Sequence, residues 1–268
     1  MYKDLKGMIR EIQPVIHRAA EFIRKESQLF NPQKLSFKSH NNFSSYVDKT
    51  SEEILVEGLS RILPGTGFLT EENTTELSDK SLRWIIDPLD GTTNFLHGYP
   101  AVAITLALME GQNILLGVTY LLQEDAMYYA IKGNGAWCGD QRLSVSPNKD
   151  LEQSLLIPGF PYDLAGKDKK YFHLLLNLLS KCHGIRSSGA SAVDLVHVAA
   201  GRADAYFEFN LFIWDIAAGI LLVEEAGGKV SDFSGGNRHL EAYEILAAGK
   251  VYFDLLNQIN SIWNHNDA

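Results

Sequence analysis

Apolar residues recur at every third or fourth position early in the chain, as they do on one face of an α-helix. This pattern predicts an amphipathic helix between residues 5 and 23, in spite of Pro14. A second helix is predicted over residues 48–63. The segment 34–45 between the two helices is polar and indicates a loop.

Short apolar and β-branched runs fill the middle of the chain and predict strands. The turn at residues 111–113 joins two such runs as a hairpin, so the predicted sheet is largely antiparallel. The predicted strands of this part are 68–70, 84–86, 102–108, 114–120, 126–131 and 154–157, with Trp137 and 143–145 continuing the pattern.

Strand and helix patterns alternate in the C-terminal half. Predicted helices cover residues 168–182, 191–200 and 214–225, a predicted strand covers 203–208, and residues 226–232 turn the chain back into a strand. The whole pattern indicates a mixed α and β protein with much antiparallel sheet.

One predicted strand ends in two acids. Trp84-Ile85-Ile86 has the composition of a strand that is buried on both faces, and Asp87 and Asp90 follow it. Two carboxylates at a rigid strand end supply the oxygen ligands that a hard divalent cation prefers. The Gly91-Thr92 turn after them offers N–H groups to an anion. The stretch therefore indicates a site for a metal and a phosphate, although the same residue types also form ordinary polar turns.

The composition narrows the possible classes of protein. With 268 residues, 46% of them hydrophobic, the chain can bury a core as one domain, 1–268, or as lobes 1–150 and 151–268. A formal net charge of −9 does not imply binding to nucleic acid or to an anionic membrane. Cys138 and Cys182 form no CxxC motif and suit a reducing compartment. No apolar signal segment or membrane-spanning run is present, so we expect a cytoplasmic protein.

Two motifs and an acidic pair carry a resemblance to a known family. The string DPLDGTTNF at residues 87–95 resembles the first signature of the inositol monophosphatase family, and residues 214–228 (WDIAAG to EAGG) resemble the second. The family belongs to the lithium-sensitive, magnesium-dependent sugar phosphatases. Thr70-Glu71-Glu72-Asn73 stands where the family carries a Gly-Glu-Glu-Ser-like element, so the acids match and both flanking residues depart. The resemblance extends from Lys38 to Gly228. It implies a layered αβαβα sandwich of the α+β class and a homodimer.

The resemblance also implies two to three Mg²⁺ ions in each active site. Their ligands would be side chains and one carbonyl: Glu71, Asp87 and the Leu89 carbonyl for the first ion, and Asp87, Asp90 and Asp215 for the second, with Glu71 sharing a third, weaker site. Such carboxylates repel one another without metal, so we expect raised pKa values in the metal-free protein. A metal-activated water near Glu71 and Thr92 would attack the phosphorus in line, and Asp48 would orient the Thr92 hydroxyl.

Substrate contacts are implied in the same way. The residues are Lys38, Asp90, Gly91, Thr92, Ala190, Ser191, Glu208 and Asp215. The backbone N–H groups of Gly91 and Thr92 would cradle the phosphate, and Glu208 would bind polyol hydroxyls. Ordinary alternatives stand beside these roles: Lys38 as a solvated loop residue, Asp48 and Asp215 as acids at helix N-termini, and Glu208 as an exposed strand-end acid.

The expected function is therefore magnesium-dependent hydrolysis of a small polyol phosphate, with inositol 1-phosphate giving inositol and phosphate. The alternatives on the same fold are fructose-1,6-bisphosphatase, histidinol-phosphatase and 3′(2′),5′-bisphosphate nucleotidase activity. A protein of another class, a regulatory binding protein without turnover, is the remaining alternative.

Overall fold

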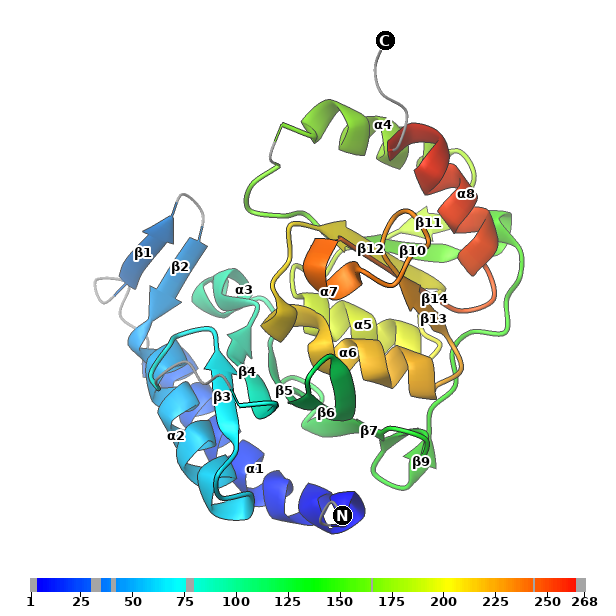
Figure 1. The fold of residues 1–268 in the computed structure, drawn as a ribbon. Coiled ribbons are helices and arrows are strands. Elements are labelled where there is room, and N and C mark those ends of the chain that lie inside the picture. Colours follow the sequence, from blue (N-terminus) through cyan, green and yellow to red (C-terminus); the bar gives the residue numbers. More distant parts are fainter. Residues whose placement is uncertain are drawn as a thin grey trace.

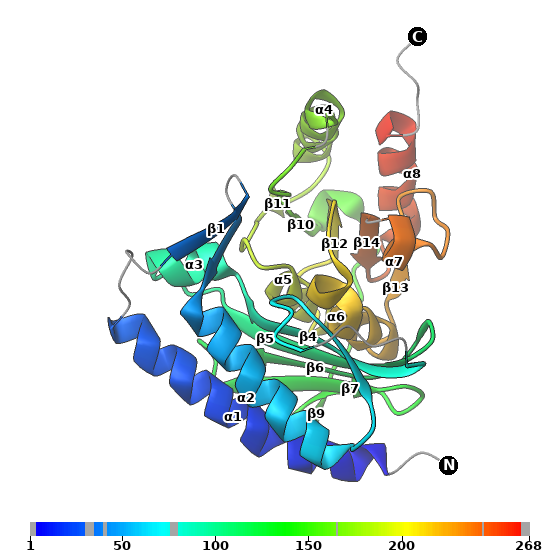
Figure 2. The same ribbon diagram turned by 60° about the vertical axis from the view of Figure 1, so that its left-hand side comes forward.

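Helices and sheets alternate in five layers through the described part of the chain (Figure 1). The computed structural model describes residues 4–29, 35–39, 42–75, 80–164, 166–242 and 244–263, of which 35–39, 42–45 and 241–242 are described by their backbone alone. A helix pair, a seven-stranded sheet, a second helix pair, a five-stranded sheet and a third helix pair follow one another (Figure 2). The predicted layered αβαβα sandwich is confirmed.

The first layer consists of α1 (Leu5–Leu29) and α2 (Tyr46–Ile62), which pack on each other and on the large sheet. Both predicted helices are confirmed. Their apolar faces bury Ile16 and Leu59 completely, in one core with Trp84 of the sheet. Burying an aliphatic side chain of this size stabilises the fold by about 1.5–3 kcal/mol. No helix in the described ranges, α1 included, is both long and apolar enough to cross a membrane.

The large sheet has the strand order β3-β4-β5-β6-β7-β8-β9. Its strands are β3 (Gly67–Thr70), β4 (Leu82–Asp90), β5 (Ala103–Glu110), β6 (Asn113–Leu121), β7 (Ala126–Ile131), β8 (Ala136–Cys138) and β9 (Gln141–Arg142). β3 and β4 run parallel, and the other neighbours are antiparallel, as predicted from the hairpin turns.

The predicted continuation of the strand pattern at residues 143–145 is wrong. Leu143 and Val145 are buried between the two sheets, and the Val145 N–H donates to the Ala226 carbonyl oxygen at 3.1 Å. Their alternating apolar pattern is therefore satisfied by packing in the core, not by a strand of the sheet.

The middle layer consists of α5 (Ser191–Ala199) and α6 (Ile213–Glu225), which lie between the two sheets. α6 packs closely on the large sheet at Gly117 of β6. A Cβ atom at that position would lie 2.8 Å from the Ala218 carbonyl oxygen, so only glycine permits this approach. Both helices were predicted from the sequence, over residues 191–200 and 214–225.

The small sheet has the order β11-β10-β12-β14-β13, and α4 (Asp168–Leu179) and α8 (Tyr252–Trp263) cover its outer face (Figure 2). Its strands are β10 (Leu155–Pro158), β11 (Gly184–Ile185), β12 (Ala205–Phe209), β13 (Lys229–Ser231) and β14 (Glu244–Ala248). β10 pairs in parallel with β11 and β12, whereas β14 is antiparallel to β12 and β13. No element was predicted for β14 or α8.

Residues 34–45 were predicted to form a loop, which is wrong for most of the segment. β1 (Leu35–Ser39) and β2 (Asn42–Ser45) pair as an antiparallel two-stranded sheet. Serine and asparagine dominate this segment and have low strand propensity, so pairing between neighbouring segments overrides local preference. The remaining short helices are α3 (Thr92–His97), η2 (Leu151–Gln153) and α7 (His239–Ala242).

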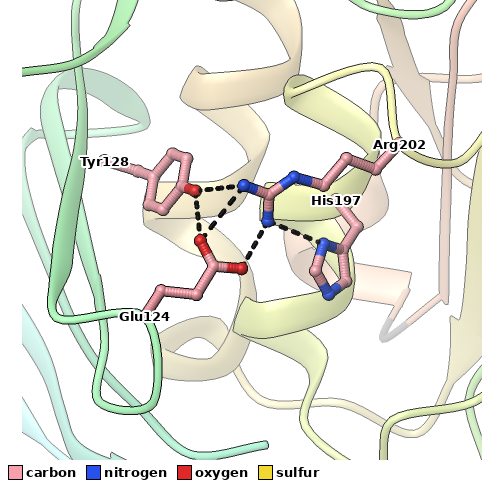
Figure 3. A network of polar contacts seen from close by, with 4 residues as sticks. All are labelled: Glu124, Tyr128, His197 and Arg202. Carbon is pink, nitrogen blue, oxygen red and sulfur yellow. Dashed lines mark hydrogen bonds and ion pairs between the residues drawn. The ribbon is translucent and has the colours of Figure 1, made fainter.

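A polar cluster ties the large sheet to the middle layer (Figure 3). Arg202, which follows α5, meets Glu124 of the β6–β7 turn in two contacts, at 2.5 Å and 3.1 Å. Its Nη2 also donates to the Tyr128 hydroxyl at 2.7 Å, and its Nη1 lies 3.4 Å from His197 Nδ1. The cluster joins the two layers in addition to their apolar packing and to other polar contacts, such as those of the Gly133 and Gly135 N–H groups with Glu225 of α6.

Candidate active site

A cavity of about 260 Å³ opens where several element ends meet. The end of β4, the start of α3 and the N-termini of α5 and α6 contribute to it, together with residues after β3, β10 and β12. The residues expected at the site that line this cavity are Glu71, Asp87, Leu89, Asp90, Gly91, Thr92, Ala190, Ser191, Glu208 and Asp215. The fold therefore brings together segments that are more than a hundred residues apart in sequence.

β4 delivers the first two acids. The strand does not stop at Pro88, as the turn-like composition suggested, but continues to Asp90 through a bulge. Asp87 pairs with Thr105 and Asp90 with Ala103, so the bulge places one extra residue on β4. Asp87 and Asp90 are only 2% and 8% exposed.

The Asp90 carboxylate is held by the start of α5. Its Oδ2 accepts the Ala192 N–H at 2.8 Å, and the Val193 N–H also contributes. These bonds favour the charged form, but burial outweighs them and raises the pKa of Asp90 to about 7.

The other acids reach the cavity from β3 and α6. Glu71 follows β3, where its N–H donates to the Ile86 carbonyl oxygen at 3.2 Å. Asp215 lies in the first turn of α6 and accepts the Phe212 N–H at 2.8 Å, so it both caps the helix and lines the cavity. Burial, followed by repulsion from Glu71 and Asp90, raises the pKa of Asp215 well above its usual range. Burial and the same two neighbours act on the pKa of Asp87 in the same direction.

These donors suit a hard divalent cation by their chemistry. Four carboxylates and the Leu89 carbonyl offer oxygen atoms only. Burial first, and neighbouring acids second, raise the pKa values of Asp87, Asp90 and Asp215, and a nearby cation would favour their charged forms. Across the described ranges, no three His, Cys, Asp or Glu side chains converge closely enough to hold a metal ion by themselves.

Thr92 and Asp48 meet as expected. Thr92 Oγ1 lies 3.1 Å from Asp48 Oδ1 and 3.1 Å from the Leu89 carbonyl oxygen, and its single hydrogen can serve one of them at a time. Asp48 is 1% exposed in the first turn of α2. Asp48 therefore lies at a helix start, as the ordinary alternative expected, and also contacts the Thr92 hydroxyl.

Gly91 turns the chain from β4 into α3. Its φ of 88° is left-handed, and a Cβ atom there would lie 2.6 Å from the Ala101 carbonyl oxygen. The turn places the first residues of α3, whose N–H groups have no partner within the helix, at the wall of the cavity.

Glu208 of β12 is buried and lines the cavity, so the alternative of an exposed strand-end acid is wrong. The Tyr206 hydroxyl donates to Glu208 Oε2. Burial raises the pKa of Glu208 to about 8. Gly159 leaves the space for this carboxylate, because a Cβ atom there would lie 1.8 Å from Glu208 Oε2. Lys38 lies on β1, whose side chains are outside the described part of the structure.

Asp194 also lines the cavity, and the sequence analysis missed it. It lies in the first turn of α5, and hydrogen bonds from Ser188 reach its carboxylate. Burial raises its pKa to about 7. The available signal was its spacing of three residues from Ser191 at a predicted helix start.

Four aromatic residues at the cavity wall were missed as well: Phe160, Tyr162, Phe212 and Trp214. Phe212 and Trp214 stack with ring centroids 4.9 Å apart and planes 9° apart. Phe160, Tyr162 and Phe212 are about half exposed, which is unusual for large apolar side chains. The run Gly159-Phe160-Pro161-Tyr162 after a predicted strand was the available signal.

Comparisons with known proteins agree with this geometry. The model of the inositol monophosphatase family matches residues 4–264. An inositol-1-monophosphatase of Mesorhizobium japonicum is 41% identical over 219 residues, covering 81% of this chain and 82% of the relative. A protein of Pasteurella multocida named Nus factor SuhB is 37% identical over 244 residues, covering 90% of this chain and 91% of the relative.

Solved structures show the same fold. The extragenic suppressor protein suhB of Bartonella henselae superposes with a TM-score of 0.88 at 36% identity, covering 94% of this chain and 98% of the other. The inositol monophosphatase of Anabaena gives a TM-score of 0.84 at 30% identity, with 97% and 98% covered. With a family match over nearly its whole length and relatives of this similarity, the chain belongs to the inositol monophosphatase family.

Proposed function

We propose that this protein is a magnesium-dependent phosphomonoesterase that hydrolyses a small polyol phosphate, with inositol 1-phosphate as the preferred substrate. Membership of the family supports a phosphatase. The observation that carries the finer proposal is one cavity in which Glu71, Asp87, Asp90 and Asp215 lie together with the start of α3 and with Glu208. The proposed metal ligands, the N–H groups that would bind phosphate and an acid that would bind polyol hydroxyls are therefore within reach of one small molecule.

Glu71, Asp87, the Leu89 carbonyl, Asp90 and Asp215 would hold two to three Mg²⁺ ions. Bound Mg²⁺ would supply positive charge to neutralise the phosphate and to lower the pKa of water. Without that charge an anionic ester would be repelled from a cavity lined by so many acids.

The chain's own groups would position the reaction. The N–H groups of Gly91 and Thr92 bind phosphate oxygens at the start of α3. Asp48 holds the Thr92 hydroxyl, and Glu71, which follows the neighbouring parallel strand β3, accepts a hydrogen bond from the attacking water. Phosphoryl transfer depends mainly on such positioning and on charge neutralisation, so no protein nucleophile is required.

Glu208, Ala190 and Ser191 would face the alcohol that leaves. Tyr206 fixes one Glu208 oxygen, which leaves the other for a substrate hydroxyl. A polyol is favoured over an apolar alcohol, because the buried carboxyls of Glu208 and Asp194 require hydrogen-bonding partners.

Phosphate release from inositol 1-phosphate, with and without Mg²⁺, tests the proposal. Turnover that needs Mg²⁺, is inhibited by lithium and is lost in Glu71→Gln supports it. Fructose 1,6-bisphosphate, histidinol phosphate and 3′-phosphoadenosine 5′-phosphate decide between the branches of the family. A faster reaction with one of them would replace inositol phosphate as the substrate.

A regulatory role without turnover is the second candidate, because several relatives bear the name Nus factor SuhB. Absence of phosphate release from every ester of the panel, with a folded protein that still binds Mn²⁺, would favour it. We also infer a homodimer, for which light scattering is the test, and a cytoplasmic location, which fractionation of cells that produce the protein would test.

A further inference from the structure

Glu52 is a buried acid outside the cavity that contacts the loop after β3. It lies in α2 and is 0% exposed. Glu52 does not line the cavity, and the proposed mechanism gives it no part. A buried carboxylate is costly unless hydrogen bonds satisfy it, so its partners indicate what it holds in place.

Within the described ranges, those partners lie in one short segment, residues 70–74. Glu52 Oε1 accepts from the Thr70 hydroxyl at 2.7 Å, from the Thr74 N–H at 2.8 Å and from the Thr74 hydroxyl at 2.7 Å. Glu52 Oε2 accepts from the Glu72 N–H at 2.8 Å. Hydrogen bonds to a charged acceptor are among the stronger ones in proteins. The segment that carries Glu71 is therefore attached to α2 on both sides of Glu71.

The direction of these bonds follows from the alternation of side chains along β3. Phe68 belongs to the core beneath α1 and α2, whereas Leu69 packs against the core between the sheets. Thr70 faces α2 again, and Glu71 lines the cavity. A slip of one residue would exchange the two faces and present Glu72 to the cavity in place of Glu71.

We propose that Glu52 is a positioning residue that fixes the register of residues 70–74, so that Glu71 and not Glu72 joins the metal-binding acids. The inference rests on the proposed metal site. It also explains a departure from the family pattern: Thr70 replaces a glycine, and its hydroxyl supplies one of the four bonds to Glu52.

Glu52→Gln tests the proposal, with Glu53→Gln as the matched control on an exposed position of the same helix. Glutamine replaces one accepting oxygen with a donating NH₂, so at least one bond to the loop is lost. We expect Mn²⁺ affinity, measured by electron paramagnetic resonance, to fall ~10–100-fold in Glu52→Gln, the usual effect of losing a group that orients a metal ligand. The Mg²⁺ concentration for half-maximal activity rises in parallel. Glu53→Gln changes neither quantity.

A comparison of the two loop acids separates register from general stability. In the unmodified protein, Glu71→Gln weakens Mn²⁺ binding and Glu72→Gln does not. In the Glu52→Gln background the difference between the two shrinks. If Glu52→Gln does not fold, Thr70→Val removes one hydroxyl at nearly constant volume and gives a smaller loss of affinity in the same direction.

Two outcomes would overturn the proposal. The first is unchanged Mn²⁺ affinity in folded Glu52→Gln, or in folded Thr70→Val if that variant has to replace it. The second is a loss of Mn²⁺ affinity in Glu71→Gln that is no larger than the loss in Glu72→Gln. These outcomes are independent of the substrate. A protein that hydrolyses no ester but shows the expected Mn²⁺ pattern contradicts the proposed function and leaves the role of Glu52 standing. Normal hydrolysis together with unchanged Mn²⁺ affinity in Glu52→Gln supports the proposed function and contradicts the role of Glu52.

Discussion

The carboxyl of Asp90 accepts a hydrogen bond from the start of α5 and still has a pKa of about 7. Burial is the main cause, and repulsion by Asp194 and Glu71 adds to it. The sequence analysis expected raised pKa values from repulsion alone. Burial and the neighbouring acids therefore favour the protonated form of the Asp90 carboxyl until a cation is present.

Asp90→Asn is expected to remove most phosphatase activity and to leave the fold intact. The amide oxygen can still accept the Ala192 N–H, and the buried charge disappears. The midpoint of thermal unfolding without metal should therefore hold or rise. Near-normal turnover at saturating Mg²⁺ would show that Asp90 is not a ligand.

The pH dependence of stability follows from the same residues. Asp90 and Asp194 have pKa values of about 7 and Glu208 of about 8 in the folded chain, above their ordinary values of about 4. The folded state then binds more protons than the unfolded state, so stability is greatest below about pH 4 for these groups and is lost as pH rises to about 8. Unfolding with a chelator present should show this decline. Glu208→Gln should flatten it, and an increase in stability over this range would contradict the assignment.

Glu208→Gln also tests the class of substrate. It should weaken hydrolysis of inositol 1-phosphate by about 1–3 kcal/mol in kcat/KM, the range for a hydrogen bond to a charged group or for leaving its partner unsatisfied. Hydrolysis of p-nitrophenyl phosphate, which has no polyol hydroxyls, should barely change. Equal losses on both substrates would mean that Glu208 serves the fold or the metal site instead.

At the scale of elements, the apolar pattern predicted α1 and α2, which bury one face, and also α6 and the strands from β4 to β7, most of which are buried on more than one side. The pattern failed for the β1–β2 pair, whose residues are largely polar and show no strand pattern. No element was predicted for β14 or α8. The metal-binding acids could be named from motifs because the motifs are contiguous. Asp194 and most of the aromatic residues lie outside those motifs, and the packing of α5, of α6 and of the segment after β10 brings them to the cavity.

The turn into α3 gives a prediction with a matched control. Gly91 and Gly98 flank the helix, and both have left-handed φ values, of 88° and 66°. Alanine at either position costs about 1–3 kcal/mol in backbone strain. Only at position 91 would the new Cβ also collide, 2.6 Å from the Ala101 carbonyl oxygen, whereas nothing lies within 4 Å at position 98. Urea unfolding should therefore show a larger loss for Gly91→Ala. Equal losses would mean that the clash relaxes freely.

At the scale of the whole molecule, the layers are joined by apolar cores and by the cluster around Arg202 (Figure 3). The organisation as one domain with lobes 1–150 and 151–268 stays a prediction. The core between the sheets nevertheless takes residues from both ranges, for example Ile85 and Ile220.

A double-mutant cycle of Arg202→Ala and Glu124→Gln measures what the cluster contributes. The side chains are 44% and 34% exposed, so solvent screens the pair, and we expect a coupling of about 0.5–1 kcal/mol that falls with added salt. The control is the pair Arg18 and Glu57, which is 50% and 51% exposed and should couple more weakly. A coupling in the cluster no larger than in the control would mean that the cluster contributes no more to stability than an exposed ion pair.

The position of α6 between the two sheets has a consequence for synthesis on the ribosome. The large sheet is complete once residue 142 has been made, but the helix that covers its inner face ends only at Glu225. During the intervening translation, apolar side chains such as Ile85 and Met109 have no permanent cover. Exposed apolar sheet surface of this kind promotes aggregation and attracts chaperones. We therefore expect the nascent chain to be most prone to aggregation, and most dependent on chaperones, while the segment between β9 and α6 is being translated.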